Sequence, residues 1–474
     1  MKRGDEITGT IEDLALEGKT IARIDGCVVF VRGGVPGDTV RMQIRAVKKN
    51  FAEADLVAIE SPSPSRTAPR CRYFGTCGGC TWQNIAYGAQ LEFKRKRVAD
   101  ALERIGGFAS PLVPSPLAMA DPYYYRNKME FSFGERWRTR EEMAVPRPAE
   151  GPPGAVCDPA LGLHLPGRYD RILDLHECWL QSAESARIVN LVREFTLAEG
   201  LPVFSTVTQS GYLRNLVIRE SKRTGERMVN LVTRDDRPEI MEKITAVLLG
   251  EFPSLTTVVN NITERRSQVA FGEIEKVYHG SGTITETIGP RRYRISANSF
   301  FQTNTAQAER LYDTALSFAR LRSTDTVYDL YSGTGTIALH IAGGARSVIG
   351  IESVEQAVND ARKNAESNGV TNCLFLHGDL KETLLSSRRQ DQPLPRPDVV
   401  IVDPPRAGMH EKVAREIVAL EPRTVVYVSC NPSTQARDLK IICESMKYTI
   451  ASIQPVDMFP HTQHIENVVG LTKM

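Results

Sequence analysis

Hydrophobic and polar positions change their pattern twice along the 474-residue chain. Up to about residue 60, short β-favouring runs alternate with tight turns. One run is Cys27-Val28-Val29-Phe30-Val31, and the turn Gly33-Gly34-Val35-Pro36-Gly37-Asp38 follows it. Short strands at this spacing predict a small β-barrel of the oligonucleotide-binding type. We therefore expect residues 1–60 to form a first domain.

The middle of the chain is less regular. Ser61-Pro62-Ser63-Pro64-Ser65 has the composition of a linker, and mixed strands and turns follow it. A helix is expected over about 88–106, where it could pack on the catalytic domain. A Pro/Gly-rich insert occupies 145–154. We expect residues 66–285 to form a mixed α+β central domain.

From about residue 286 onward, strands and helices alternate, which predicts a doubly wound parallel sheet. Apolar runs end in polar residues at several places, for example Val399-Val400-Ile401-Val402 before Asp403. Open α/β sheets bind their ligands at the carboxyl ends of their strands. Residues 286–474 are therefore the expected catalytic domain.

Composition and charge exclude few classes of protein. The chain carries 59 Lys and Arg against 57 Asp and Glu, so its net charge is only +2 and any basic surface must be local. The first residues lack an apolar core, and no run has the length of a membrane span. We expect a cytoplasmic protein with no membrane partner, and nothing implies a protein partner. In that compartment the nine cysteines are expected to be unpaired.

Three cysteines are clustered near the start of the central domain, as Cys71-(x5)-Cys77-Gly-Gly-Cys80. Thiolates at this spacing suit zinc or an iron–sulfur cluster, and either needs a fourth ligand. Cys178 is preferred because it stands where a helix could begin. The alternative, Cys157, lies in the Pro/Gly-rich region.

A second pattern predicts a nucleotide cofactor site. The strand that contains Asp329 runs into the glycine-rich turn Ser332-Gly333-Thr334-Gly335, and the next strand ends in Glu352. An acidic residue at that position binds ribose hydroxyls. The glycine pattern alone is also compatible with a nicotinamide cofactor. Asp329 before the turn is more typical of S-adenosylmethionine-dependent methyltransferases, and Asp379 follows a third strand.

Three further residues stand at the ends of successive predicted strands: Asp403, Cys430 and Glu466. A lone cysteine at a strand end is usually a small buried residue. Here it follows one carboxylate and precedes another, beside a cofactor turn. This combination is the one needed for a thiol nucleophile with a nearby base.

These pieces together resemble the RNA uracil-C5 methyltransferase family, which makes 5-methyluridine. The resemblance covers the C-terminal half, and the start of the chain resembles a TRAM domain, an RNA-binding appendage. With the cysteine cluster, the match is to the family's 23S ribosomal RNA branch. Its motifs here are Phe301-Gln302-Thr303-Asn304, Asp329-Leu330-Tyr331-Ser332-Gly333, Asp403-Pro404-Pro405-Arg406, Ser429-Cys430-Asn431-Pro432 and His464-Ile465-Glu466-Asn467.

The resemblance implies a Rossmann-like class I methyltransferase that uses S-adenosylmethionine and acts on 23S rRNA. It implies Cys430 as the nucleophile that adds to C6 of uracil, and Glu466 as the base that removes the C5 proton. The implied cofactor-binding residues are Gln302, Tyr331, Gly333, Glu352, Asp379 and Asp403. The implied ligands of a [4Fe-4S] cluster are Cys71, Cys77, Cys80 and Cys178.

A uracil in structured RNA must be turned out to reach such a site, so stacking and phosphate contacts are expected. Tyr123, Tyr124 and Tyr125 are candidates for stacking, and Arg126 and Lys128 are candidates for phosphate contacts. The alternating residues Phe131 and Phe133 are expected to face the core instead. His461 and His464 are interpreted as loop histidines without a catalytic role.

Several alternatives stay open. The chain could methylate uridine in tRNA, or an exocyclic amine of adenine or guanine, although Arg406 stands where such enzymes usually have a stacking aromatic. A cytosine C5-methyltransferase would bring a Pro-Cys dipeptide, which this sequence lacks. A radical methylthiolation enzyme would need an x3 rather than an x5 spacing in the cysteine cluster. A non-catalytic RNA-binding module would not explain the cofactor turn.

Overall fold

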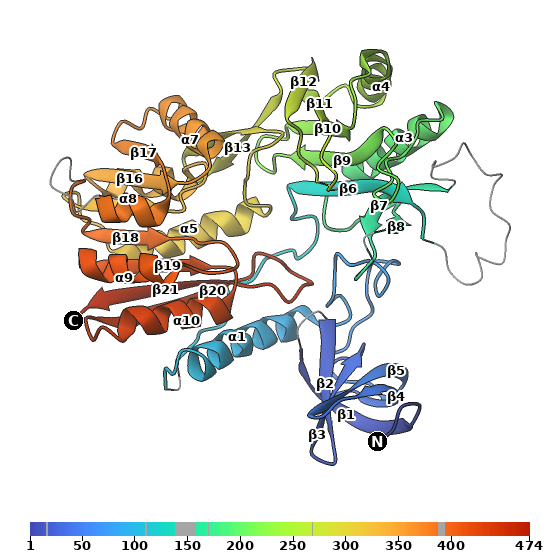
Figure 1. Ribbon diagram of the computed structural model, residues 1–474, viewed down its shortest axis with the longest axis horizontal. Coiled ribbons are helices and arrows are strands. Elements are labelled where there is room, and N and C mark those ends of the chain that lie inside the picture. Colours follow the sequence, from blue (N-terminus) through green and yellow to red (C-terminus); the bar gives the residue numbers. More distant parts are fainter. Residues whose placement is uncertain (16–17, 110, 138–157, 169, 268, 387–393) are drawn as a thin grey trace.

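A computed structural model describes residues 1–15, 18–109, 111–137, 158–168, 170–267, 269–386 and 394–474. Figure 1 shows three parts: an N-terminal barrel, a central sheet flanked by helices, and a larger α/β unit that contains the C-terminus. The insert at 145–154 and Cys157 lie outside the described residues. Among the helices that the structure describes, none is both long and apolar enough to cross a membrane.

The N-terminal unit is a closed five-stranded barrel in the order β1-β2-β3-β5-β4. Side chains alternate along each strand, so every second residue enters the barrel, including Val29, Val31, Val40 and Met42. The bounds are β1 Glu6–Leu14, β2 Lys19–Ile24, β3 Cys27–Arg32, β4 Thr39–Val47 and β5 Phe51–Ser61.

The segment 61–65 is an ordered connection, although its composition predicted only a linker. Ser63 is buried, and its N–H donates to Oδ1 of Asp38 at 2.8 Å. Asp38 is fully buried and also binds Arg66, so the segment after the barrel is fixed to the turn before β4.

The central unit is a seven-stranded sheet in the order β12-β11-β10-β9-β6-β7-β8. Helices α3 (Ala183–Ala198) and α4 (Pro238–Glu251) share its main hydrophobic core. Phe131 and Phe133 are buried in that core, as the alternation predicted. The strands are β6 Lys128–Glu135, β7 Pro159–His164, β8 Ile172–Asp174, β9 Leu213–Glu220, β10 Arg227–Thr233, β11 Thr257–Ile262 and β12 Ile274–His279.

The α/β unit carries a second seven-stranded sheet, in the order β17-β16-β15-β18-β19-β21-β20. Its first five strands in that order are parallel, and β21 runs antiparallel to β19. The strands are β15 Thr326–Leu330, β16 Ser347–Glu352, β17 Cys373–His377, β18 Val399–Val402, β19 Thr424–Ser429, β20 Tyr448–Val456 and β21 Glu466–Lys473. This order brings the carboxyl ends of the parallel strands and the start of β21 to one edge.

Helices cover both faces of this sheet, and the hairpin of β13 and β14 joins one of its two cores. Helix α1 (Tyr87–Arg104) comes from before the central sheet but packs on α10, as Figure 1 shows. Its apolar residues Val98 and Leu102 belong to the core of the α/β unit. The remaining elements are β13 Thr283–Ile288, β14 Arg291–Ser296, α5 Thr305–Ala319, α6 Thr336–Ile341, α7 Glu355–Ser367, α8 Leu380–Ser386, α9 Glu411–Leu420 and α10 Pro432–Cys443.

Candidate active site and cysteine pocket

The three site residues predicted from the strand ends lie at one edge of the α/β sheet. Asp403 follows β18, Cys430 follows β19, and Glu466 is the first residue of β21. The antiparallel register pairs Ser429 with Asn467. Continuing that register by one residue places Cys430 opposite Glu466, so a thiol and a carboxyl group that are 36 positions apart in sequence become cross-strand neighbours.

These groups lie close enough to shift each other's protonation. Burial and the negative charges of Glu466 and Asp403 together raise the pKa of the Cys430 thiol to about 11. Burial and Asp403 likewise raise the pKa of Glu466 well above its ordinary value. Arg406 acts in the opposite direction on both groups. Without a bound cation, the thiol therefore remains protonated at neutral pH.

Arg406 also belongs to this site, although it was not predicted as a site residue from the sequence. Its backbone oxygen accepts the Asn431 side-chain N–H at 3.0 Å and the Thr434 hydroxyl at 3.3 Å. Asn431 also caps α10 by accepting the N–H of Ser433. The residues just after Cys430 thus hold the segment that carries Arg406 beside the thiol. The sequence signal that could have indicated this position is a cationic side chain directly after Asp403-Pro404-Pro405.

The glycine-rich turn after β15 has an open side and a packed side. Gly335 is the N-cap residue of α6 with φ of 77°, and a Cβ there would approach Phe375 to 2.8 Å. Gly333 also has a positive φ, but nothing lies within 4 Å of the place of its Cβ. The Gly335 position therefore needs glycine for packing. The space beside Gly333 is open to a ligand.

Acidic side chains surround this turn. One carboxylate oxygen of Glu352 accepts the Gly333 N–H at 3.0 Å. The buried Asp329 accepts the Ala338 N–H through Oδ2, while its Oδ1 has no hydrogen-bond partner. Burial, Asp403 and Glu352 raise the pKa of Asp329 to about 8.

Tyr331 and Asp379 complete the group on this side. Tyr331 is held in the left-handed region with φ of 63°, a costly conformation for a non-glycine residue. Burial, Asp438, Asp379 and Glu352 raise its pKa to about 12. Asp379 is exposed and accepts the Glu382 N–H at the start of α8. A site with this many carboxyl groups around an open turn suits a ligand with positive charge, which the sulfonium of S-adenosylmethionine carries.

Gln302 lies on the segment between β14 and α5, and its backbone oxygen accepts the Asn127 side-chain N–H at 2.8 Å. Nearby Asn304 caps α5 and donates to the backbone oxygen of Met458, ahead of Glu466. Phe300 in the same segment is 70% exposed, which is unusual for a large aromatic residue. The sequence alone does not distinguish it from Phe301, because two adjacent Phe residues look alike until their burial is known.

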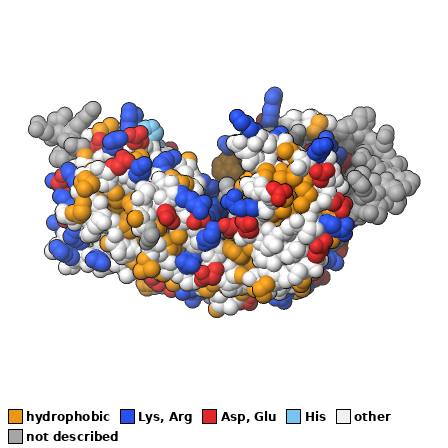
Figure 2. All heavy atoms as spheres, turned by 90° about the horizontal axis from the view of Figure 1, so that it is seen from below, with side chains coloured by type: hydrophobic (Ala, Val, Ile, Leu, Met, Phe, Trp, Pro, Cys, Tyr) orange, Lys and Arg blue, Asp and Glu red, His pale blue; other side chains and the backbone are white. Residues whose placement is uncertain are grey.

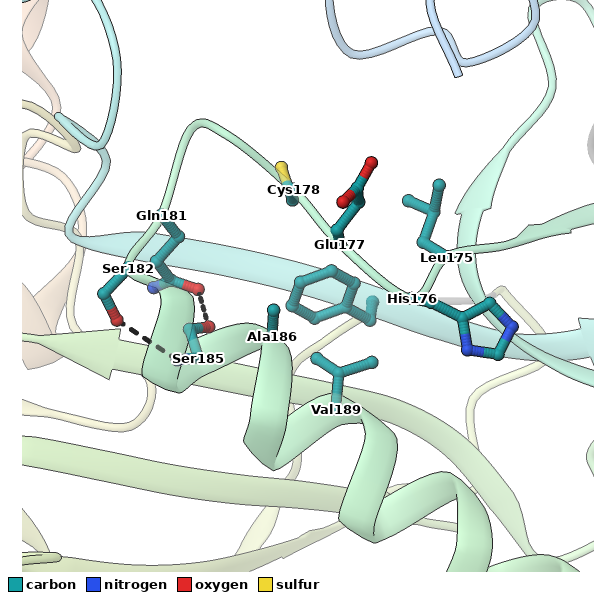
Figure 3. A pocket seen from close by; sticks show the side chains of 10 residues that line it. Leu175, His176, Glu177, Cys178, Gln181, Ser182, Ser185, Ala186 and Val189 are labelled. Atoms are coloured by element: carbon teal, nitrogen blue, oxygen red, sulfur yellow. Dashed lines mark hydrogen bonds between the residues drawn. The ribbon is translucent and has the colours of Figure 1, made fainter. Parts of the chain in front are cut away.

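The four predicted cluster cysteines line one pocket, which also contains Trp179 and Leu163. Cys71, Cys77 and Cys80 come from the segment before α1, and Cys178 comes from the loop between β8 and α3. Cys178 does not start a helix, since α3 begins at Ala183. Figure 3 shows its sulfur pointing away from α3.

The chemistry of this pocket suits a thiolate-bound group. The eight cysteines that the structure describes are all free of disulfides. Burial raises the pKa of Cys77 to about 11 and that of Cys80 to about 12, so their thiols are neutral until a metal displaces the protons. The Gly79 N–H already points at the sulfur of Cys77, at 3.3 Å.

Within the described ranges, no group of three or more His, Cys, Asp or Glu side chains is arranged to hold a metal ion. A single zinc ion would bring its sulfur ligands to about 2.3 Å from one point. The four thiols nevertheless line the same pocket, so they form one set of sulfur donors.

The candidate RNA contacts occupy different environments. Lys128 is half-buried and forms a salt bridge with Glu130 at 2.5 Å, and its contact with phosphate stays a prediction. Tyr123 packs on His461 with ring centroids 4.4 Å apart, and Tyr125 is buried. Arg126 is half-buried; burial raises the pKa of Cys80 and lowers that of His464, and the charge of Arg126 offsets the first effect in part and adds to the second. Of this set, Tyr123, Tyr124 and Arg126 are only partly buried, so they stay candidates for RNA contact.

Comparison with known proteins places this geometry in a family. Residues 283–474 match the tRNA (uracil-5-)-methyltransferase family, and residues 1–57 match the TRAM domain. An uncharacterized RNA methyltransferase from Chlorobaculum tepidum is 44% identical over 98% of this chain and 96% of its own length. The chain belongs to the RNA uracil-C5 methyltransferase family. The resemblance to this family and to a TRAM domain is thereby confirmed.

Two further relatives extend the comparison. An uncharacterized RNA methyltransferase from Bacteroides thetaiotaomicron is 42% identical over 97% of this chain and 99% of its own length. A crystal structure of a Pyrococcus abyssi tRNA (uracil-54, C5)-methyltransferase in complex with S-adenosyl-L-homocysteine superimposes with a TM-score of 0.74. It is 29% identical and covers 98% of this chain and 100% of its own. These matches support an RNA substrate and S-adenosylmethionine as the methyl donor for this family member.

Proposed function

We propose that the protein transfers a methyl group from S-adenosylmethionine to C5 of a uridine in 23S rRNA. The observation that carries this proposal is the position of Cys430 opposite Glu466 beside an acid-rich cofactor turn. In the proposed mechanism, the Cys430 sulfur bonds to C6 of uracil, and the ring electrons move to the O4 side as an enolate. This makes C5 nucleophilic enough to take a methyl group.

S-adenosylmethionine supplies an electrophilic methyl carbon on a positively charged sulfur. C5 attacks that carbon as the methyl–sulfur bond breaks, leaving S-adenosylhomocysteine. Glu466 then takes the C5 proton, and the electron pair of that C–H bond expels the Cys430 thiolate from C6. Arg406 assists thiolate formation, because its charge opposes those of Glu466 and Asp403 at the sulfur.

The remaining residues bind rather than react. Glu352 is proposed to hold the ribose hydroxyls, with Tyr331 and Gly333 beside the cofactor and Asp379 at the adenine edge. Asp403 and Gln302 are proposed to hold polar edges of uracil or cofactor. The exposed ring of Phe300 would stack on the RNA.

The four cysteines of the pocket are proposed to hold a [4Fe-4S] cluster through their thiolates. Replacing Cys80 by Ser should sharply lower the bound iron and sulfide per protein, measured after anaerobic purification. The matched control is Cys443→Ser, because Cys443 is a half-buried thiol far along the chain in α10. Equal iron content in the wild type and both variants would refute the cluster.

Two experiments test the reaction. Glu466→Gln should trap an RNA–protein adduct that survives denaturation, and Cys430→Ala should form none. Mapping 5-methyluridine by mass spectrometry in a deletion strain should show loss of a methyl group from 23S rRNA. If every 23S site kept its methyl group, the ribosomal substrate would be excluded.

A tRNA uridine is the second candidate substrate, because the Pyrococcus abyssi structural relative is a tRNA (uracil-54, C5)-methyltransferase. The same deletion strain separates the two possibilities. Loss of 5-methyluridine from tRNA with an unchanged 23S rRNA would assign the protein to tRNA.

A further inference from the structure

The loop that delivers Glu466 is bound along its length by helix α1, which comes from a distant part of the chain. This loop, residues 457–465, joins β20 to β21, and the last paired residues before it are Val456 and Glu466. A hairpin loop of this length has no ladder of its own to fix it. Its contacts therefore decide how firmly the first residue of β21 is held.

One face of α1 makes those contacts. Tyr87, Gln90, Lys94 and Arg97 follow at spacings of three, four and three residues, which places them on a single side of the helix. All four bind the 457–465 loop. We call these four side chains the α1 clamp.

The first part of the α1 clamp fixes the start of the loop. The Lys94 ammonium donates to Oδ1 of Asp457 at 2.5 Å and to the backbone oxygen of Phe459 at 3.0 Å. The Tyr87 hydroxyl donates to the other carboxylate oxygen of Asp457 at 2.8 Å. Lys94 and Asp457 both have fully buried side chains.

The second part fixes the middle and the end of the loop. Gln90 accepts the backbone N–H of His461 at 2.9 Å, and Arg97 donates to the backbone oxygen of Gln463 at 2.6 Å. His461 is held in the left-handed region with φ of 63°. Its backbone oxygen accepts N–H groups from Thr81 and Trp82, just after the cysteine segment, at 2.9 and 3.0 Å. A strained residue stays in place only when its surroundings fix it.

A buried ion pair is a poor device for stability alone, since well-packed apolar residues of similar volume often stabilise a protein as well or better. Its directional contacts do, however, select one loop conformation. We propose that the α1 clamp positions Glu466, through the 457–465 loop, for removal of the C5 proton. This inference rests on the proposed function, in which Glu466 is the base. Lys94 and Asp457 are then positioning residues, because they act through the loop and do not touch the reacting atoms.

The test compares Lys94→Met with Arg95→Met, a matched change on the next residue of the same helix. The Arg95 side chain is 41% exposed and forms a salt bridge with Glu92, three residues before it. Purified variants are mixed with S-adenosylmethionine and total RNA from a strain that lacks the gene. For Lys94→Met, we expect kcat to fall about 10- to 100-fold, because a misplacement of about 1 Å can cost that much. KM for RNA should change less than about threefold, and the RNA–protein adduct should accumulate. Arg95→Met should match the wild type.

Because Lys94→Met leaves Asp457 buried without its cation, the double variant Lys94→Met/Asp457→Asn provides a second measurement with no unpaired charge. It should show the same loss of kcat and the same adduct. If the α1 clamp only stabilised the fold, these variants would melt at lower temperature, yet turn over normally below that temperature and build up no adduct. That result would overturn the inference.

Glu466→Gln is run beside these variants to separate the two proposals. If Glu466→Gln traps no adduct, the proposed mechanism itself fails. If Glu466→Gln traps the adduct while both Lys94 variants behave like the wild type, only the positioning role of the α1 clamp fails.

Discussion

The charge of Glu466 has a measurable effect on Cys430 that does not depend on RNA. Burial, Glu466 and Asp403 raise the pKa of Cys430 to about 11. Glu466→Gln removes one of the two carboxylates, and because burial and Asp403 raise the pKa of Glu466 itself, the effect of its charge on the thiol grows as the pH rises. Directly opposed residues of antiparallel strands have Cα atoms about 5 Å apart. At that separation and an effective dielectric constant of about 20, one unit charge contributes roughly 3 kcal/mol as an upper limit. Solvent near the half-exposed thiol weakens this, so we expect the Cys430 pKa to fall by roughly 1 to 2 pH units.

Because a lower pKa leaves more of the thiol ionised, Cys430 should be alkylated faster in Glu466→Gln than in the wild type, although the variant is expected not to complete methyl transfer. At about pH 9, the thiolate fraction should rise roughly 10- to 50-fold. A less basic thiolate is also less nucleophilic, which lowers the rate constant of the thiolate itself by a factor of about 3 to 8. The net prediction is a rate of reaction with iodoacetamide roughly 3- to 6-fold above that of the wild type.

The assay follows modification of the peptide that contains Cys430 by mass spectrometry, from about pH 7 to 11, without RNA or cofactor. Cys443 provides an internal control, because burial alone raises its pKa to about 11. Its alkylation rate should be the same in the wild type and in Glu466→Gln. Equal Cys430 rates in the two proteins, with Cys443 also unchanged, would refute the electrostatic contact between Glu466 and the thiol.

Three further predictions concern binding and stability. Glu352→Gln should weaken S-adenosylmethionine binding about tenfold by calorimetry, since Glu352 accepts the Gly333 N–H of the cofactor turn and is proposed to hold ribose. An unchanged affinity would exclude Glu352 from the cofactor site. Phe300→Ala should raise KM for RNA about tenfold with little change in melting temperature, because the ring is exposed; an unchanged KM would exclude stacking. Burial alone would raise the pKa of Asp38, but Arg66 and backbone N–H groups outweigh it and lower that pKa. Asp38→Asn should therefore lower the free energy of unfolding, measured with urea, by about 3 kcal/mol above about pH 4. The difference from the wild type should shrink as the pH falls through the pKa that Asp38 has in the folded protein. A difference that does not change with pH would contradict this.

The sequence by itself determined the local chemistry of this protein. β-favouring residues followed by a turn are a local signal, so the strands that end before Asp403 and Cys430 are found where the pattern predicts them. The glycine-rich turn and the alternation that buries Phe131 and Phe133 are local in the same sense. The order of such segments along the chain was enough to infer the resemblance to the family.

Only the tertiary structure decided what depends on residues far apart in the chain. Lys94 stands in a run of four basic residues, yet it is fully buried because its partner Asp457 lies 363 positions away. Arg406 and Phe300 gain their importance from neighbours and exposure, which no local pattern encodes. The cysteine spacing indicated a metal site, but the fold brought Cys178 to the other three thiols. Local propensity acts over a few residues, whereas burial and charge pairing depend on the packing of the whole chain.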